Sequence, residues 1–241
     1  RKIVKTEPYN IAILGDLQGP KLRIGELENN KLILKECDRF IFTTEKMVGT
    51  NNKIYVSYPN LTTDVKPGER IFLDDGKMEL KVVEILNDKE VLMSVTLGGI
   101  LTPKKGVNLP DSVLTMPSMT EKDFTDLEFI IDQKLDWVAL SFVRKAEDIK
   151  ALKKIIKARE SKIKVIAKIE MPEALKNLRD IIVESDGVMV ARGDLGVEVP
   201  IEQVPVIQKD IIRKCMHRAK PVIVATQMME SMLDRTKPNR S

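Results

Sequence analysis

Charged and hydroxyl side chains stand at the ends of five short apolar stretches of this sequence. Lys168 and Glu170 end the stretch KVIAKIE, and Asp194 ends the predicted strand DGVMVARGD. Carboxylates from two such ends, without a nearby pair of His or Cys residues, favour a hard divalent cation such as Mg²⁺ or Mn²⁺. A lysine beside them adds a positive charge that suits an anionic substrate. The residues at the five ends are Asp16, Ser141, Arg144, Lys168, Glu170, Arg192, Gly193, Asp194, Thr226 and Gln227.

Each of these residues also has an interpretation that involves no chemistry. Lys168 and Glu170 are two positions apart on one face of a predicted strand, where a surface ion pair is common. Arg144 and Arg192 would then brace the structure, and Thr226 would be a hydroxyl with a satisfied hydrogen bond. The gathering of polar residues at five stretch ends favours one functional site over five unrelated features.

The five apolar stretches fit the strands of a parallel sheet that is covered on both faces. Amphipathic segments separate them from residue 118 onward; the first is a predicted helix that begins at Ser118 or Thr120 and has Phe124 and Leu127 on its apolar face. Repeated strand–helix units predict an α/β fold, either a (β/α) barrel or a doubly wound sheet. In a parallel barrel the active site lies at the C-terminal ends of the strands, where the polar residues gather here.

Residues 31–109 have a different pattern, with short strands and turns that contain Gly and Pro. Asp75 and Gly76 between two apolar runs predict a β-hairpin. The segment shows little helical periodicity, so we predict a small antiparallel barrel or sandwich.

The stretch NIAILGDLQ, which precedes this segment, has the character of the later α/β strands. We therefore predict one α/β domain interrupted by an inserted β domain. The predicted boundaries are residues 1–18 for the first part of the α/β domain, 19–117 for the inserted domain and 118–241 for the second part. Gly19 stands at the exit, where it permits an unusual backbone conformation.

The composition excludes several classes of function. The 40 basic and 36 acidic residues nearly balance and are scattered, which is not typical of a nucleic-acid-binding surface. No apolar run approaches the roughly 18 residues of a membrane span. Cys37 and Cys215 lie far apart and fit no disulfide framework, so we expect buried thiols in a reducing, cytoplasmic compartment. His217, the only histidine, falls late in a predicted helix, which argues against histidine catalysis.

Several longer motifs resemble those of one protein family. The stretches IAKIE, GVMVARGDLGVEVP, KPVIVATQMMESM, LDDG and KKGVNLP closely resemble pyruvate kinase, and the resemblance extends over essentially all 241 residues. It implies a (β/α)₈ TIM-type barrel with an inserted small β-barrel domain that closes as a lid. It also implies the last step of glycolysis, in which phosphoenolpyruvate and ADP give pyruvate and ATP.

The resemblance implies roles for the residues at the strand ends. Glu170 and Asp194 match the ligands of the divalent metal ion, Mg²⁺ or Mn²⁺. Lys168 matches the lysine that contacts the phosphate and stabilises charge during phosphoryl transfer and on the enolate of pyruvate. The backbone of Gly193 and Asp194 matches the segment that holds the substrate carboxylate. Thr226 matches the substrate-binding threonine near the path of proton delivery.

Two further residues match positions that contact the nucleotide, Arg23 near the exit from the α/β domain and Lys105 on the inserted domain. A second divalent cation would arrive with the nucleotide. The resemblance thus implies phosphoenolpyruvate and ADP or ATP as partners, with neither nucleic acid nor a membrane.

Lys21 bears on the need for a monovalent cation. Family members that depend on K⁺ usually carry Glu at this position, and Thr where this chain has Leu17 and Ile24. The chain therefore resembles the potassium-independent group, in which the ammonium supplies the charge that K⁺ would bring. Asp16 matches a ligand of the monovalent cation and would pair with Lys21 instead. The alternative is that Lys21 is only a surface charge at the domain junction.

The chain departs from the family pattern in its extent. Nothing matches the family's first two barrel strands, its eighth strand or its C-terminal domain, so five of eight barrel strands are represented. We expect the chain alone to be inactive and poorly soluble, because open strand edges aggregate. We expect the parent enzyme to be a homotetramer.

Two alternative functions stay open. One is a metal-dependent aldolase of the citrate-lyase type, which would not require ADP. The other is a truncated product that serves as a binding or assembly module.

Overall fold

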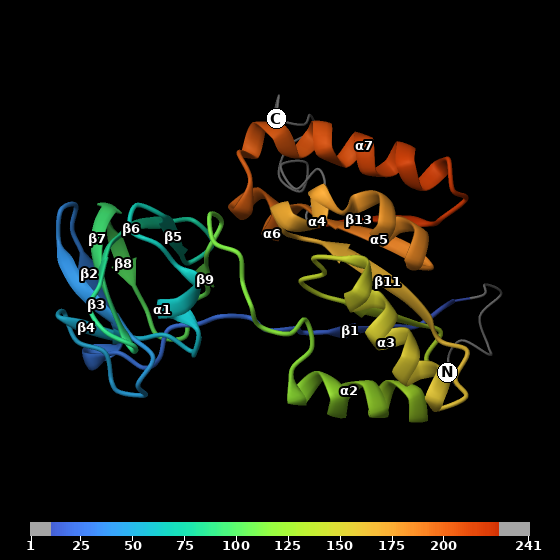
Figure 1. The fold of residues 1–241 in the computed structure, drawn as a ribbon, viewed down its shortest axis with the longest axis horizontal. Coiled ribbons are helices and arrows are strands. Elements are labelled where there is room, and N and C mark those ends of the chain that lie inside the picture. The colour runs from blue at the N-terminus through green and yellow to red at the C-terminus, as the bar shows by residue number, and fades with distance from the viewer. Residues whose placement is uncertain (1–10, 227–241) are drawn as a thin grey trace, which may run out of the picture.

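The computed structural model describes residues 11–226 and contains two bodies joined by two chain crossings (Figure 1). One body is a parallel sheet with helices packed against it. The other consists of short strands. We call them the α/β body and the β body.

The α/β body is built on a five-stranded parallel sheet. Its strands follow one another in space in their chain order, as in successive units of a (β/α) barrel. This arrangement confirms the predicted α/β fold class. The strands are β1 (Leu14–Leu17), β10 (Trp137–Leu140), β11 (Lys164–Ile169), β12 (Gly187–Ala191) and β13 (Val222–Ala225).

Helices connect the strands of this sheet. They are α2 (Glu121–Asp132), α3 (Ala146–Ala158), α4 (Pro172–Lys176), α5 (Leu178–Glu184), α6 (Arg192–Glu198) and α7 (Val204–Met216), with the short 3₁₀ helix η3 (Ile201–Gln203) before α7. Thr120 caps α2, because its hydroxyl accepts from the N–H of Asp123 and its own N–H donates to the Asp123 carboxylate. Asp123 is fully buried in the first turn of α2, whereas Phe124 is 47 % exposed. The prediction that Phe124 faces the core is therefore wrong, whereas Leu127 is fully buried.

One hydrophobic cluster holds the sheet and its helices together. It includes Leu17 of β1 and Leu140 of β10, with Ile149 and Leu152 of α3. Ile149 and Leu152 are three residues apart, so they lie on one face of the helix. Burial of each such side chain contributes about 1.5–3 kcal/mol. The cluster fixes the strands from whose ends the polar residues project.

The β body contains eight short strands. Asp75 and Gly76 lie in the turn between β5 and β6, where the predicted hairpin is, and both have positive φ. Two strands, β2 and β8, form one sheet; the others form a second in the order β4-β3-β7-β6-β5-β9, antiparallel except between β3 and β4. The elements are η2 (Glu28–Asn30), β2 (Leu32–Leu34), β3 (Arg39–Thr43), β4 (Lys53–Tyr55), α1 (Leu61–Asp64), β5 (Arg70–Leu73), β6 (Met78–Ile85), β7 (Glu90–Leu97), β8 (Gly99–Leu101) and β9 (Val107–Asn108).

The β body has its own hydrophobic cluster, which shares no residue with that of the α/β body. Phe40 and Phe42 pack edge to face in it, with ring centroids 5.3 Å apart. Cys215 is buried as expected, but Cys37 is exposed. Cys37 lies in the turn before β3 with φ of +68°, so the expectation of a buried thiol is wrong there.

Two crossings connect the bodies (Figure 1). The first leaves β1 through Gly19, whose φ is +67° and whose N–H donates a 3.0 Å hydrogen bond to Asp123. The second returns through residues 114–116 to α2. The division of the chain into domains at residues 19 and 117 stays a prediction.

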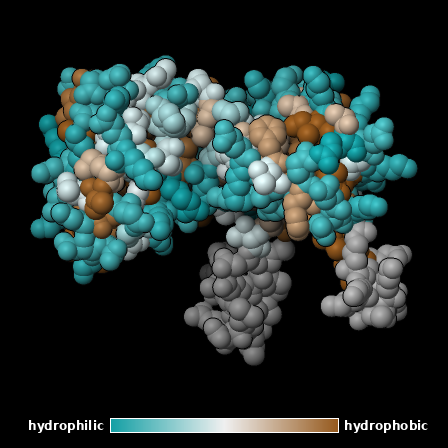
Figure 2. All heavy atoms as spheres, turned by 90° about the horizontal axis from the view of Figure 1, so that it is seen from below, coloured by the Kyte–Doolittle hydropathy of each residue, from teal (hydrophilic) through white to brown (hydrophobic). Residues whose placement is uncertain are grey.

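Figure 2 shows how apolar residues are distributed on one face of the molecule. Seen from below, the described atoms are mostly hydrophilic, with separate hydrophobic patches on both bodies (Figure 2). Within residues 11–226, no helix has the length and apolar character that crossing a membrane requires.

Candidate active site

Lys168 lies at the centre of a polar cluster at the carboxyl ends of β1, β10 and β11. Its Nζ is 3.2 Å from Asp16 Oδ2 and 3.1 Å from Glu170 Oε1, and it donates a 2.8 Å hydrogen bond to Ser141 Oγ. The parallel register of the three strands places their ends side by side. The side chains of Lys168 and Glu170 are only 13 % and 2 % exposed. The pair is therefore not the surface ion pair that sequence alone also allowed.

Burial and charge oppose each other in this cluster. Burial lowers the pKa of Lys168, but the carboxylates of Glu170 and Asp16 outweigh burial and leave that pKa raised. Burial raises the pKa of Glu170, and Lys168 and the N–H of Phe142 only partly offset this rise. The result is a lysine that stays charged beside a carboxylate deprived of water. Such a carboxylate gains from a cation that replaces its lost hydration.

The loop after β10 orients Glu170. The N–H of Phe142 donates a 2.8 Å hydrogen bond to Glu170 Oε2. Phe142 has φ of +53°, a strained conformation for a non-glycine residue that its surroundings must hold in place. The sequence does not reveal this contact, because a backbone donor leaves no trace in the residue type.

Gly193 and Asp194 lie in the first turn of α6, directly after β12. The N–H of Gly193 donates a 3.1 Å hydrogen bond to Thr226 Oγ1. Arg192 donates to the carbonyl oxygens of Ala225 and Thr226 at 2.9 and 3.0 Å, so it braces the ends of β12 and β13. The prediction that the strand continues to Asp194 is wrong, because the chain turns into α6 at Arg192. Thr226 has φ of +75°, a second strained residue in this region.

The donor set of Glu170 and Asp194 fits a hard divalent cation. The charge of Asp194 contributes to the raised pKa of Glu170, so the two carboxylates interact electrostatically. Among residues 11–226, no three His, Cys, Asp or Glu side chains gather into a metal cage. Mg²⁺ is commonly bound by one or two carboxylates, with water and substrate oxygens completing its coordination. The two carboxylates suit Mg²⁺ or Mn²⁺ bound together with a substrate.

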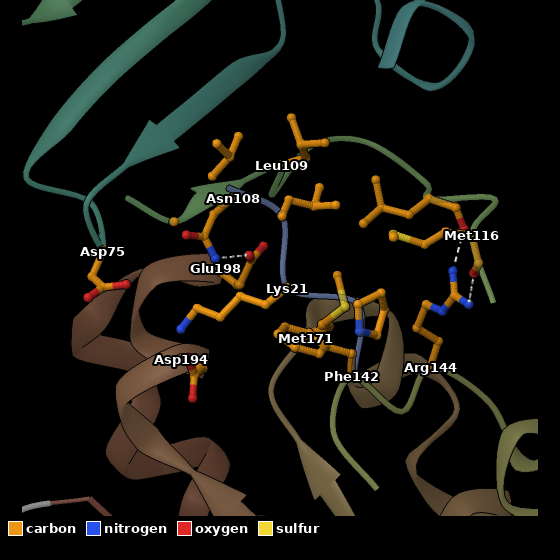
Figure 3. Close-up of a pocket in the computed structure, with 15 residues that line it drawn as sticks. Lys21, Asp75, Asn108, Leu109, Met116, Phe142, Arg144, Met171, Asp194 and Glu198 are labelled. Carbon is orange, nitrogen blue, oxygen red and sulfur yellow. Dashed lines mark hydrogen bonds between the residues drawn. The ribbon is translucent and has the colours of Figure 1, made fainter. Parts of the chain in front are cut away.

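A cavity between the two bodies lies beside α6 (Figure 3). Lys21 reaches into it from the first crossing, and its ammonium points to the side where Asp75 and Asp194 lie (Figure 3). Asp16 pairs with Lys168 and not with Lys21. The predicted pairing of Asp16 with Lys21 is therefore wrong, because the chain turns at Gly19 and carries Lys21 into the cavity.

Glu198 links α6 to the β body across this cavity (Figure 3). Its Oε1 accepts a 2.7 Å hydrogen bond from Asn108 Nδ2, and its Oε2 is buried without a partner among the described residues. Burial raises the pKa of Glu198 to about 7, and the hydrogen bond from Asn108 opposes this rise. The role of Glu198 was not predicted from the sequence, because α6, on which Glu198 lies one turn after Asp194, was not predicted.

The two predicted nucleotide-contacting residues lie close together on the β body. Arg23 forms a β-bridge with Gly106, and its guanidinium donates a 2.8 Å hydrogen bond to the carbonyl oxygen of Lys104. Lys105 forms a 2.8 Å ion pair with Asp74. Arg23 and Lys105 therefore share one edge of the β body, and their roles stay predictions.

Two residues named at the strand ends do not join the cluster. Gln227 lies outside the described residues. Arg144 points to the return crossing, where its guanidinium donates to the carbonyl oxygens of Leu114 and Met116 (Figure 3).

Comparison with known proteins gives consistent relatives. The family profile described as "Pyruvate kinase, barrel domain" matches residues 1–241. The pyruvate kinases of Clostridium perfringens and Thermotoga maritima are 44 % and 45 % identical over 243 and 231 residues. These alignments cover 100 % and 96 % of this chain but 51 % and 49 % of those proteins. The chain thus spans about half the length of these curated relatives.

A solved structure gives the same result. The crystal structure of a pyruvate kinase from Cryptosporidium parvum matches with a TM-score of 0.92 and 36 % sequence identity. The match covers 99 % of this chain and 50 % of that chain.

Proposed function

The chain belongs to the pyruvate kinase family, and we propose that the full-length protein that contains it transfers the phosphoryl group of phosphoenolpyruvate to ADP, giving pyruvate and ATP. The observation that carries this proposal is the buried pair of Lys168 and Glu170 at the strand ends. A charged lysine held by two carboxylates and a hydroxyl is a fixed positive charge, which phosphoryl transfer chiefly needs.

Lys168 acts on the transferring phosphoryl group. Its ammonium stabilises the negative charge that spreads over the phosphoryl oxygens and then over the enolate oxygen of pyruvate. Asp16, Ser141 and Glu170 hold this ammonium in place, so it does not need to reorganise during the reaction. A divalent cation bound by Glu170 and Asp194 would add Lewis-acid charge at the same substrate oxygens.

Thr226 and the first turn of α6 hold the other end of the substrate. The backbone at Gly193 and Asp194 receives the substrate carboxylate through N–H groups. Thr226 Oγ1 already accepts from the N–H of Gly193, so its own hydroxyl proton can point toward the substrate. This arrangement supports the role of Thr226 near the proton that reaches C3 of the enolate.

The β body supplies the nucleotide contacts. Arg23 and Lys105 offer two cations for the phosphates of ADP, and a second divalent cation would enter with the nucleotide. The cavity between the bodies is lined by Lys21 and Asp194 and by Leu22 and Gly106, the chain neighbours of Arg23 and Lys105.

Lys21 is the basis for a finer proposal, that the enzyme needs Mg²⁺ but not K⁺. Its ammonium lies in the cavity beside Asp194, where it can provide the monovalent charge. We also propose a cytoplasmic homotetramer that binds neither nucleic acid nor membranes.

The test is an assay of the full-length protein with phosphoenolpyruvate, ADP and Mg²⁺, first in tetramethylammonium and then in K⁺. Equal amounts of pyruvate and ATP support the proposal, and full activity without K⁺ supports the role of Lys21. A metal-dependent reaction that needs no ADP would favour the aldolase. Metal-dependent binding of phosphoenolpyruvate without turnover, measured by calorimetry, would favour a binding module.

A further inference from the structure

Arg144 has a position that the proposed reaction does not use. It follows β10, is 9 % exposed, and places its guanidinium between the α/β body and the return crossing. Within residues 11–226 no carboxylate forms an ion pair with this guanidinium. Its acceptors are two backbone carbonyl oxygens, those of Leu114 and Met116.

The return crossing is held from both sides. Arg144 binds carbonyl groups two residues apart, which face the same way in an extended chain. The intervening Thr115 turns to the β body, where its N–H donates a 2.7 Å hydrogen bond to Asp64 and its hydroxyl a second one at 3.0 Å. Asp64 is buried and also accepts from the hydroxyl of Tyr58. Residues 114–116 thus form a strap between a cation of one body and an anion of the other.

The loop that carries Arg144 also contacts the proposed catalytic groups. Ser141 accepts from Lys168, and the N–H of Phe142 donates to Glu170. The N–H of Arg144 donates a 2.9 Å hydrogen bond to Asp148 in the first turn of α3. One loop of four residues therefore holds the lysine, the metal-binding glutamate and the strap.

We propose that Arg144 is a positioning residue that fixes the strap 114–116, and through it the nucleotide-contacting edge of the β body, relative to the metal site. This inference rests on the proposed function. Arg144 lines the cavity between the bodies but is not among the residues proposed to bind substrate or metal, and it acts by anchoring the return crossing about which the β body would close. An arginine is well suited to bind both carbonyl groups, because its planar guanidinium presents N–H donors in a fixed fork.

The experiment compares Arg144→Met and Arg144→Lys with the wild type in the full-length protein. We expect Arg144→Met to raise KM for ADP about tenfold, to lower kcat less than threefold, and to leave the affinity for Mn²⁺ alone unchanged. Arg144→Lys keeps the positive charge but loses the planar guanidinium, so its KM for ADP should lie between that of the wild type and that of Arg144→Met. Hydrogen exchange of the amides of residues 112–116 should rise at least fivefold in Arg144→Met, while that of α3 stays the same.

Two variants serve as comparisons. Thr115→Val loosens the other side of the strap and should also raise KM for ADP, so it carries the test if Arg144→Met does not fold. Arg213→Met removes an exposed guanidinium that pairs with Asp210, and should change none of these quantities.

An unchanged KM for ADP with a fall in kcat alone, or a parallel loss of Mn²⁺ affinity, would overturn the proposal in favour of a general structural role. If the wild type makes no pyruvate, the proposed function fails by itself. The hydrogen exchange of residues 112–116 then still decides whether Arg144 holds the strap, and an unchanged rate overturns the proposal.

Discussion

Lys168 and Glu170 form a buried ion pair, with 3.1 Å between the ammonium nitrogen and a carboxylate oxygen. Two forces set the protonation of this pair: burial, which opposes both charges, and their mutual attraction, which favours them. Because Asp16 also attracts the ammonium, Lys168 keeps its charge. The site therefore offers a fixed cation next to a carboxylate suited to a metal.

Replacement of Lys168 tests its role in the reaction. Lys168→Met removes the charge, so we expect kcat for pyruvate formation to fall by roughly 10²–10³-fold or more. Lys164→Met in the same strand is the matched control, since Lys164 stacks on Trp137 away from the cluster, and it should keep activity. Steady-state kinetics of both variants make the comparison. If kcat of Lys168→Met lies within tenfold of the wild-type value, Lys168 does not have the proposed role in the reaction.

Lys21→Glu should impose a requirement for K⁺. The change removes the ammonium from the cavity beside Asp194, so activity in tetramethylammonium should fall at least tenfold and return when K⁺ is added. Lys31→Glu, on the exposed surface of the β body, is a control of equal charge change. Equal activity of Lys21→Glu with and without K⁺ would reduce Lys21 to a surface charge at the crossing.

Glu198 should make stability depend on pH. Its pKa is about 7 in the folded protein and 4.5 as the reference, so between these values the folded state holds a proton that the unfolded chain has lost. The contribution to the free energy of unfolding is complete below pH 4.5 and is lost as pH rises through 7. We expect the free energy of unfolding of the wild type to fall by about 1–3 kcal/mol relative to that of Glu198→Gln when the pH rises from 5 to 8.

Urea unfolding at several pH values measures this difference. Glu198→Gln keeps an oxygen that can accept from Asn108, so the contact between the bodies can persist. The exposed Glu202→Gln should differ from the wild type by the same small amount at every pH. If the free energies of unfolding of the wild type and Glu198→Gln change in parallel with pH, Glu198 is not held in a buried, protonated form.

Gly19→Ala should destabilise the first crossing. Gly19 has φ of +67°, and an added Cβ would lie 2.8 Å from the ring of Phe142 and 3.2 Å from Ser141. Gly68→Ala is a matched control, because Gly68 also has positive φ but its Cβ would meet nothing within 4 Å. Thermal or urea unfolding should show Gly19→Ala about 1–3 kcal/mol less stable than Gly68→Ala. Equal stability of the two variants would show that the Phe142 ring moves away from the added methyl group without a measurable energetic cost.

The strands were predictable because their signal is local. Short continuous apolar runs identified β10 to β13, and a capping pattern identified the start of α2 near Thr120. Helix α6 was not predictable, because its seven residues include Gly193 and Gly196, which weaken a helix. Its formation depends on packing after β12, where Leu195 is fully buried.

The site was predictable in its residue types but not in its contacts. Carboxylates and a lysine at neighbouring strand ends indicated a metal and an anion. The pairing of Asp16 with Lys168 joins residues 152 positions apart and depends on the order of strands in the sheet. The N–H of Phe142 that orients Glu170 depends on backbone geometry. Such contacts follow from the fold, which the residue types alone do not specify.

The most direct test of the central claim is the location of Mn²⁺ by anomalous scattering in crystals of the full-length protein, for the wild type and for Glu170→Gln. The account predicts one Mn²⁺ bound by the carboxylates of Glu170 and Asp194 in the wild type, near the ammonium of Lys168, and loss of that peak in Glu170→Gln. Mn²⁺ bound away from these two carboxylates, or retained equally in the variant, would contradict it.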